Sequence, residues 1–143
     1  MGKVAIVTGG NKGIGFGIVK GLAKVFDGDV FLTARNVERG MEAVKTLEQE
    51  NIHVKFHQLD IDDPKSNAAI ATFMKENYGG IDVLVNNAYA GVDMIFSNAR
   101  KKFHEMDPVS AWDTINGVGL RNHFLCTTYA SRLKIVLFFK SFT

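Results

Sequence analysis

Three glycines near the start of the chain have the spacing expected of a phosphate-binding loop. Gly9, Gly13 and Gly15 follow a short apolar run and open a segment with helical apolar periodicity. Glycine at the first position permits a tight turn, at the second lets the backbone approach a pyrophosphate, and at the third allows close packing of a helix on a sheet. The amino end of that helix would offer free N–H groups to an anion. The strand-like run before the loop and the helical pattern after it favour a dinucleotide site over an ordinary glycine-rich turn.

Arg35 indicates which dinucleotide the loop would take. About twenty residues beyond the glycines, an NAD site usually supplies an Asp or Glu for the ribose hydroxyls, whereas this chain has Arg35. An acid there would repel a 2′-phosphate, but a guanidinium can clamp one, and Lys12 in the glycine loop is expected on the same side. The sequence therefore favours NADPH over NADH, the alternative being that Arg35 is a solvated surface charge.

Polar residues also follow two later apolar runs. Asp60 comes after the third run and could accept a hydrogen bond from the amino group of adenine, or could cap the turn that follows it. Asn86 and Asn87 end the fourth run, where their amides could fix neighbouring strands, line the cofactor cleft, or do both. We expect these side chains at the carboxyl edge of a sheet, because doubly wound sheets bind their ligands there.

Alternating strand and helix patterns would position these residues. Short runs rich in β-branched residues predict strands at residues 4–7, 30–33, 54–57 and 81–85. Apolar residues at three- and four-residue steps predict a helix in each interval, with stripes at Ile14, Ile18, Leu22 and Val25, at Met41, Val44 and Leu47, and at Ile70, Phe73 and Met74. Asp63 before Pro64 is a favourable start for the third helix. Crossovers of this length give parallel strands in a doubly wound sheet.

The rest of the chain continues this pattern only briefly. Residues 109–133 have a helical pattern, and a short strand candidate follows at residues 135–139. The sequence therefore predicts an α/β fold, with residues 1–143 forming a single partial Rossmann-type domain. Its doubly wound parallel sheet would be incomplete, with four strands plus a possible fifth and the carboxyl-terminal half missing.

Composition argues against several other classes of protein. Hydrophobic residues make up 46% of the chain and charged residues 22%, and the net charge of +2 comes from scattered basic residues, so neither disorder nor a nucleic-acid partner is expected. The longest apolar run, residues 135–139, is far shorter than the about 20 residues that a membrane helix needs. The lone Cys126 and histidines without ligand spacing predict no metal site. Without a secretory signal at the start, the expected location is cytoplasmic.

These motifs resemble those of the short-chain dehydrogenase/reductase family. The glycine loop, the Asp after the third strand and the Asn-Asn-Ala after the fourth match the family pattern, with Tyr89 in place of its final Gly. Residues 4–88 are similar to the monomeric NADPH-dependent carbonyl reductases, whereas residues 86–133 resemble a different family member, dehydrogenase/reductase member 1. The resemblance implies either a mosaic of two relatives or a lineage that retains features of both.

The resemblance also implies a set of cofactor contacts. Carried over position by position, it predicts that NADPH touches Gly9, Asn11, Lys12, Gly13, Ile14, Gly15, Arg35, Asp60, Ile61, Asn87 and Ala88. The family reduces small carbonyl substrates by hydride transfer, with a Ser, a Tyr and a Lys that lie on and after the fifth strand.

Catalytic residues are not expected within this chain. Tyr129 and Lys134 have the wrong spacing and fall before the fifth strand, and Gly119 occupies the position of the asparagine that the family uses in a proton relay. We therefore expect a chain truncated before its catalytic residues. It would be either the cofactor-binding half of a carbonyl reductase, or an inactive module that holds the nucleotide or pairs with a full-length relative.

Overall fold

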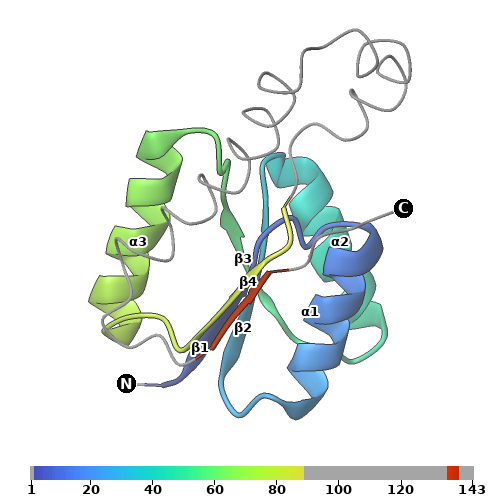
Figure 1. Cartoon of the computed structure of the whole chain (residues 1–143). Helices are drawn as coiled ribbons and strands as arrows, with labels where there is room; N and C mark the ends of the chain where they lie inside the picture. Colours follow the sequence, from blue (N-terminus) through green and yellow to red (C-terminus); the bar gives the residue numbers. More distant parts are fainter. Residues whose placement is uncertain (1, 89–134, 139–143) are drawn as a thin grey trace, which may run out of the picture.

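The strands of this chain form one parallel sheet. The computed structural model describes residues 2–88 and 135–138. The elements in chain order are β1 (Val4–Val7), α1 (Gly13–Val25), β2 (Asp29–Ala34), α2 (Val37–Gln49), β3 (Lys55–Gln58), α3 (Pro64–Tyr78), β4 (Val83–Asn86) and β5 (Ile135–Phe138). The strands lie in the order β3-β2-β1-β4-β5 (Figure 1).

The sheet order confirms the predicted doubly wound topology. β1 lies at the centre, where Ile6 pairs with Phe31 of β2 on one side and with Leu84 of β4 on the other, both in parallel. From this central strand the chain first winds outward through β2 to β3, then returns to the other side of β1 at β4. The possible fifth strand is confirmed as β5, parallel to β4. The helix expected at residues 109–133 lies outside the described residues.

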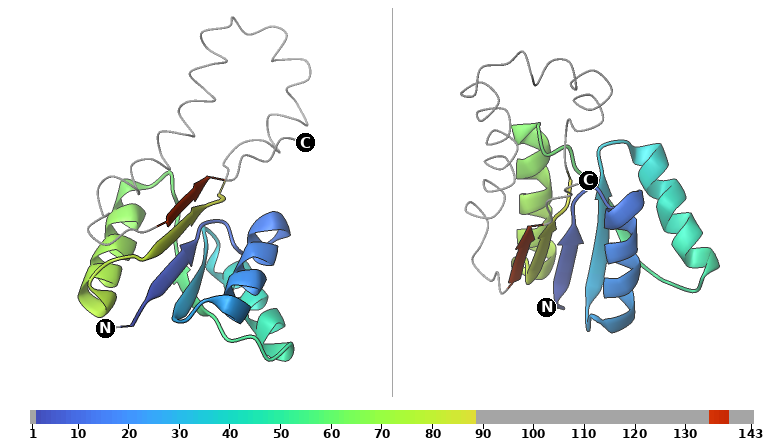
Figure 2. Two further views of the ribbon diagram at one scale, coloured as in Figure 1. Left: turned by 60° about the horizontal axis from the view of Figure 1, so that its bottom comes forward. Right: turned by 45° about the vertical axis from the view of Figure 1, so that its right-hand side comes forward.

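Helices cover both faces of the sheet. Alternate residues of β1 point in opposite directions, so that Val4 and Ile6 pack with residues of α3, while Ala5 and Val7 pack with residues of α1 and α2. Both views in Figure 2 show α3 on one face and the other two helices on the opposite face. All of β1 is buried because both of its faces are covered. No helix in the described segments is long and apolar enough to cross a membrane.

Two predicted apolar stripes are confirmed in part. Val44 and Leu47 of α2 are buried, and Ile18 and Leu22 of α1 pack against the same core. The remaining positions of both stripes are exposed. Ile14 and Val25 are 55% and 81% exposed, while Gly15 and Val19 are the buried residues of α1. In α2, Met41 is 51% exposed. The buried faces of both helices include a glycine, Gly15 in α1 and Gly40 in α2. Glycine has no apolar side chain, so hydrophobic periodicity could not detect these positions.

Side chains fix the starts of two helices. The Asn36 side chain accepts a hydrogen bond of 2.9 Å from the Arg39 N–H at the start of α2. Asp63 accepts one of 2.9 Å from the Lys65 N–H at the start of α3, and Pro64 follows it as predicted. Each cap satisfies an N–H group that has no partner within its own helix.

Replacing Gly40 with Ala should destabilise the fold. A methyl group at Gly40 would overlap the ring of Phe56 on β3, and such overpacking costs about 1–3 kcal/mol. We expect a lower midpoint in urea-induced unfolding, followed by circular dichroism.

Gly17→Ala is the matched control, because it makes the same change in α1, where a methyl group would meet no described residue within 4 Å. Alanine is the better helix former, so this variant should be about 0.5–1 kcal/mol more stable. Equal effects of the two substitutions would contradict close packing of α2 on β3.

Candidate functional site

The glycine loop connects β1 to α1 with two residues in the left-handed region. Gly9 has φ 62° and Gly13 has φ 56°, a conformation that favours glycine. A Cβ at Gly9 would lie 2.9 Å from the Cα of Ala88, so the loop packs closely against the end of β4. A Cβ at Gly13 would meet no atom of the described part of the chain within 4 Å. The backbone at Gly13 therefore borders open space, as its predicted role beside a pyrophosphate requires.

Gly15 makes a different close contact from the one expected. A Cβ at this position would overlap the carbonyl oxygen of Gly9 and the side-chain nitrogen of Asn87. The glycine thus lets the first turn of α1 pack against its own loop and the end of β4, in addition to covering the sheet. Any side chain here would push the helix away from the loop.

A cluster of hydrogen bonds, which we call the Thr8–Asn87 clasp, joins the ends of β1 and β4. The fully buried Thr8 hydroxyl donates to the Val85 carbonyl at 3.3 Å and accepts from the backbone N–H groups of Asn87 at 3.0 Å and Ala88 at 2.9 Å. The Asn87 side-chain amide donates to the carbonyls of Thr8 and Gly9, both at 3.1 Å. Asn87 therefore fixes neighbouring strands, one of the two roles predicted for it.

The sequence analysis did not single out Thr8. A polar residue directly after a buried strand, beside a glycine turn, was the available signal. The neighbouring Gly10 is also held, since its N–H donates to the Thr33 carbonyl at 2.9 Å, while the Thr33 hydroxyl donates to the Val7 carbonyl at 2.9 Å. The loop is thus tied to both strands that flank β1.

The amino end of α1 has no side-chain cap. Lys12 occupies the cap position in an extended conformation, and its side chain makes no capping hydrogen bond. The other two described helices are both capped by side chains. Backbone N–H groups in the first turn of α1 therefore lie next to the open side of the Gly13 turn. An anion placed there would gain both these donors and the positive end of the helix dipole.

Two predicted basic residues lie at this same edge of the sheet. Lys12 follows β1 and Arg35 follows β2, which are neighbouring strands, and both residues are exposed. The backbone carbonyl of Arg35 accepts a hydrogen bond of 3.1 Å from the Gln58 side chain. The Arg35 guanidinium forms no ion pair with any residue of the described segments. It is therefore available to an anionic group.

Asp60 performs one of the two roles that the sequence left open, and its contact with adenine stays a prediction. Its Oδ1 accepts a hydrogen bond of 3.0 Å from the Asp62 N–H, so the residue does cap the turn after β3. Its Oδ2 has no partner among residues 2–88 and 135–138 and remains available for a ligand. The neighbouring Ile61 is only 6% exposed and belongs to the apolar core on the α3 side. Contact between Ile61 and a cofactor stays a prediction, and its burial leaves mainly its backbone for that purpose.

The remaining predicted contacts border the same region. Asn11 lies in the loop and is half-buried, Ile14 is exposed on the first turn of α1, and Ala88 is half-buried beside Gly9. The buried Asn86 precedes the clasp on β4. The structure thus gathers all the predicted contact positions at the carboxyl ends of β1, β2, β3 and β4.

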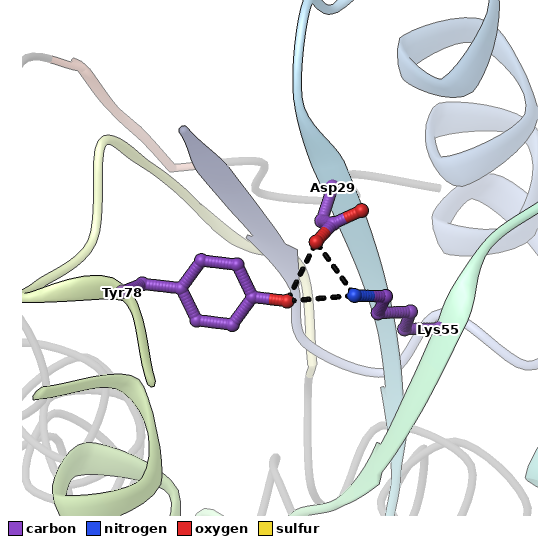
Figure 3. Close-up of polar contacts among 3 residues, drawn as sticks. All are labelled: Asp29, Lys55 and Tyr78. Carbon is purple, nitrogen blue, oxygen red and sulfur yellow. Dashed lines mark hydrogen bonds and ion pairs between the residues drawn. The ribbon is translucent and has the colours of Figure 1, made fainter. Parts of the chain in front are cut away.

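A second polar cluster lies at the opposite, amino edge of the sheet. Figure 3 shows Asp29 at the start of β2, Lys55 at the start of β3 and Tyr78 at the end of α3. Asp29 Oδ2 accepts hydrogen bonds from the Lys55 ammonium at 2.7 Å and the Tyr78 hydroxyl at 2.6 Å. Lys55 also donates to the Tyr78 oxygen at 3.0 Å. The sequence analysis did not find this cluster, whose members come from three distant segments.

Charge and burial shift the ionisation of all three groups. The hydrogen bond from Lys55, and then that from Tyr78, lowers the pKa of Asp29. The hydrogen bond to Asp29 raises the pKa of Lys55. Burial, followed by the hydrogen bond to Asp29, raises the pKa of Tyr78, so the phenol is held in its neutral form. This tyrosine and lysine therefore connect β2, β3 and α3 at the edge opposite the glycine loop.

Several sequence predictions concern residues outside the described segments. Tyr129, Lys134, Gly119 and Cys126 are among them. Within residues 2–88 and 135–138, no three His, Cys, Asp or Glu side chains gather as metal ligands would.

Comparison with known proteins identifies relatives of this chain. The family model for short chain dehydrogenases matches residues 3–135. Carbonyl reductase (NADPH) 1 from Homo sapiens is 59% identical over 85 residues, which make up 59% of this chain and 31% of the human protein. Carbonyl reductase (NADPH) 3 from Rattus norvegicus is 45% identical over 125 residues, or 87% of this chain and 41% of the rat protein. The chain therefore spans less than half the length of either relative.

Solved structures show the same arrangement of elements. A metagenomic short-chain oxidoreductase in complex with NADP has a TM-score of 0.63 and 31% identity, over 86% of this chain and 52% of that one. Salutaridine reductase from Papaver somniferum has a TM-score of 0.57 and 40% identity, over 78% of this chain and 40% of that one. The similarity to carbonyl reductases predicted for the first part of the chain is confirmed.

Replacing Lys55 with Met should change how stability depends on pH. The contribution of Asp29 is present above its ordinary pKa of 3.8 and is lost as the pH falls through the lowered folded value. The contribution of Lys55 is present below its ordinary pKa of 10.5 and is lost as the pH rises through the raised folded value. The difference in urea midpoint between the wild type and the variant should therefore be largest between about pH 4 and pH 10.

Lys3→Met is the control for this experiment. Lys3 pairs with Asp27 at 3.5 Å, but the Asp27 side chain is 98% exposed, and ion pairs so exposed contribute little. This substitution should shift the midpoint slightly and equally at every pH. A Lys55→Met curve parallel to that of the wild type would show that the cluster does not stabilise the fold.

Proposed function

The chain belongs to the short chain dehydrogenase family, and from this premise we propose that it binds NADPH along the carboxyl edge of its sheet. In this proposal it provides the cofactor-binding part of an oxidoreductase that acts on small carbonyl compounds. Both carbonyl reductases matched above carry NADPH in their names, and one solved relative was determined with NADP.

The open face of the Gly13 turn carries the proposal. A side chain at this position would enter that space, where no atom of residues 2–88 and 135–138 lies within 4 Å of the place that a Cβ would take. Uncapped N–H groups of α1 border it, which suits a pyrophosphate. The Thr8–Asn87 clasp holds these donors in place before a ligand arrives, so little ordering cost remains for binding.

Arg35 supports the choice of NADPH over NADH. Its guanidinium is exposed at the end of β2, and a planar fork of donors suits the 2′-phosphate that distinguishes the two cofactors. Lys12, at the end of the neighbouring strand, adds positive charge at the same edge. No acidic residue stands at the position of Arg35 to hold the ribose hydroxyls of NADH.

Bound NADPH would supply a hydride to a carbonyl carbon. The residues described here bind and orient the cofactor. A phenol must also give a proton to the carbonyl oxygen in this family. Within residues 2–88 and 135–138 the only tyrosine is Tyr78, which lies at the amino edge with a raised pKa. This placement favours the second candidate function, a module that holds the nucleotide without turning it over or that pairs with a full-length relative.

Replacing Arg35 with Gln should weaken NADPH binding and spare NADH. Loss of a charged contact to a phosphate corresponds to about 1.5–3 kcal/mol, or roughly ten- to hundredfold in Kd. NADH has no 2′-phosphate, so its affinity should be unchanged. Titration calorimetry with each cofactor measures both values.

Lys45→Gln removes the same charge from an exposed position further along α2 and is the control. It should leave both affinities unchanged. Equal weakening of NADH and NADPH by Arg35→Gln would argue against a 2′-phosphate contact, and absence of binding by the wild type to either cofactor would overturn the proposed function.

A turnover assay distinguishes the reductase from the binding module. We expect the purified chain to bind NADPH but not to oxidise it in the presence of a reactive dicarbonyl, because the described edge holds no phenol to donate the proton. Absorbance of the reduced nicotinamide reports the rate, and chain without dicarbonyl gives the baseline. Oxidation above that baseline would assign the catalytic step to this chain.

A further inference from the structure

The first turn of α3 holds the loop that carries Asp60. The Ser66 hydroxyl accepts a hydrogen bond of 2.9 Å from the backbone N–H of Asp60. The Asn67 side-chain amide donates one of 3.1 Å to the carbonyl of Ile61. Two consecutive helical residues thus bind two consecutive loop residues. The start of α3, which Asp63 and Pro64 fix, therefore determines where Asp60 lies.

Burial of the polar Asn67 side chain costs free energy of folding. It is only 4% exposed, and its Oδ1 has no hydrogen-bond partner among the described residues. A buried acceptor left unpaired opposes folding. The hydrogen bond from this side chain to the Ile61 carbonyl offsets that cost. The buried amide is thus used to hold the loop next to Asp60.

The held loop presents one carboxylate oxygen in a defined direction. Oδ1 of Asp60 is engaged by the Asp62 N–H at 3.0 Å, and the Asp60 carbonyl accepts from the Asp63 N–H at 3.1 Å. With the N–H also bound to Ser66, three polar atoms of this residue are fixed. Oδ2 is the polar atom of Asp60 that has no hydrogen-bond partner among the described residues. An acceptor held this way loses little conformational freedom on binding a donor.

We propose that Ser66 is a positioning residue for adenine recognition: by anchoring the N–H of Asp60, it aims Oδ2 at the 6-amino group of the bound NADPH. The inference rests on the proposed function and adds to it a residue that touches neither cofactor nor substrate. Ser66 sets how well the protein distinguishes adenine from a base that lacks the amino group, while the phosphate contacts at the glycine loop stay the same.

The test compares NADPH with its hypoxanthine analogue, in which a carbonyl oxygen replaces the 6-amino group. The wild-type chain should prefer NADPH by about tenfold, the value of one hydrogen bond to a charged acceptor. In Ser66→Ala the preference should fall to about twofold or less, mainly through weaker NADPH binding. Calorimetric Kd values for both nucleotides give the ratio, which a general loss of structure would not change selectively.

Three further variants complete the experiment. Ser66→Thr retains the hydroxyl and should retain the preference. Ser66→Cys has nearly the same shape but a weak acceptor, so it should lose the preference even if Ser66→Ala does not fold. Asn77→Ala removes a similar bond of 2.8 Å, from its side chain to the Phe73 carbonyl at the other end of α3, and should change nothing.

The outcomes separate this inference from the proposed function. A wild type that binds neither nucleotide overturns the proposed function, and the role of Ser66 with it. A wild type that prefers NADPH, with Ser66→Cys and Ser66→Ala keeping the full preference, overturns the role of Ser66 alone. Equal binding of both nucleotides by the wild type would contradict the contact between Asp60 and adenine, and with it the role of Ser66.

Discussion

The buried hydroxyl of Thr8 is the contact on which the candidate site depends. It joins β1 to β4 through three hydrogen bonds, and the Asn87 amide adds two more to the same junction. Thr8 is fully buried, so water does not compete for these bonds. The glycine loop starts from this fixed point, and Gly15 brings the first turn of α1 back against it. The N–H groups in the first turn of α1, which we propose bind phosphate, are thereby held beside the loop.

The polar groups at the two edges of the sheet differ in how many contacts they make within the protein. At the carboxyl edge the start of α1 has no side-chain cap, Arg35 is exposed, and Oδ2 of Asp60 has no partner among the described residues. At the amino edge the polar groups bind one another. Asp29, Lys55 and Tyr78 connect β2, β3 and α3, and the carboxylate of Asp82 accepts from the Val4 N–H at 2.9 Å.

Helix α3 serves both edges at once. Its last residue, Tyr78, packs edge-on against Phe31 with ring centroids 5.7 Å apart and donates to Asp29. Its first turn holds the Asp60 loop through Ser66 and Asn67. A rigid helix anchored at one end can position a loop at the other, because its hydrogen-bonded backbone has few ways to deform. The adenine contact proposed for Asp60 would therefore draw on packing at the far edge.

The sequence alone determined the alternation of strands and helices, the glycine loop and the basic residue at the end of β2. These features follow from local rules, since periodicity and glycine spacing report the conformation of neighbouring residues. The tertiary structure decided which distant residues form hydrogen bonds with one another. Thr8 and Asn87 are 79 residues apart in the chain, and Asp29 and Tyr78 are 49 apart. Such pairs meet only once the sheet has formed, and a glycine on a buried helix face gives no apolar signal. The full set of contacts in the clasp and the amino-edge cluster could therefore be found only in the fold.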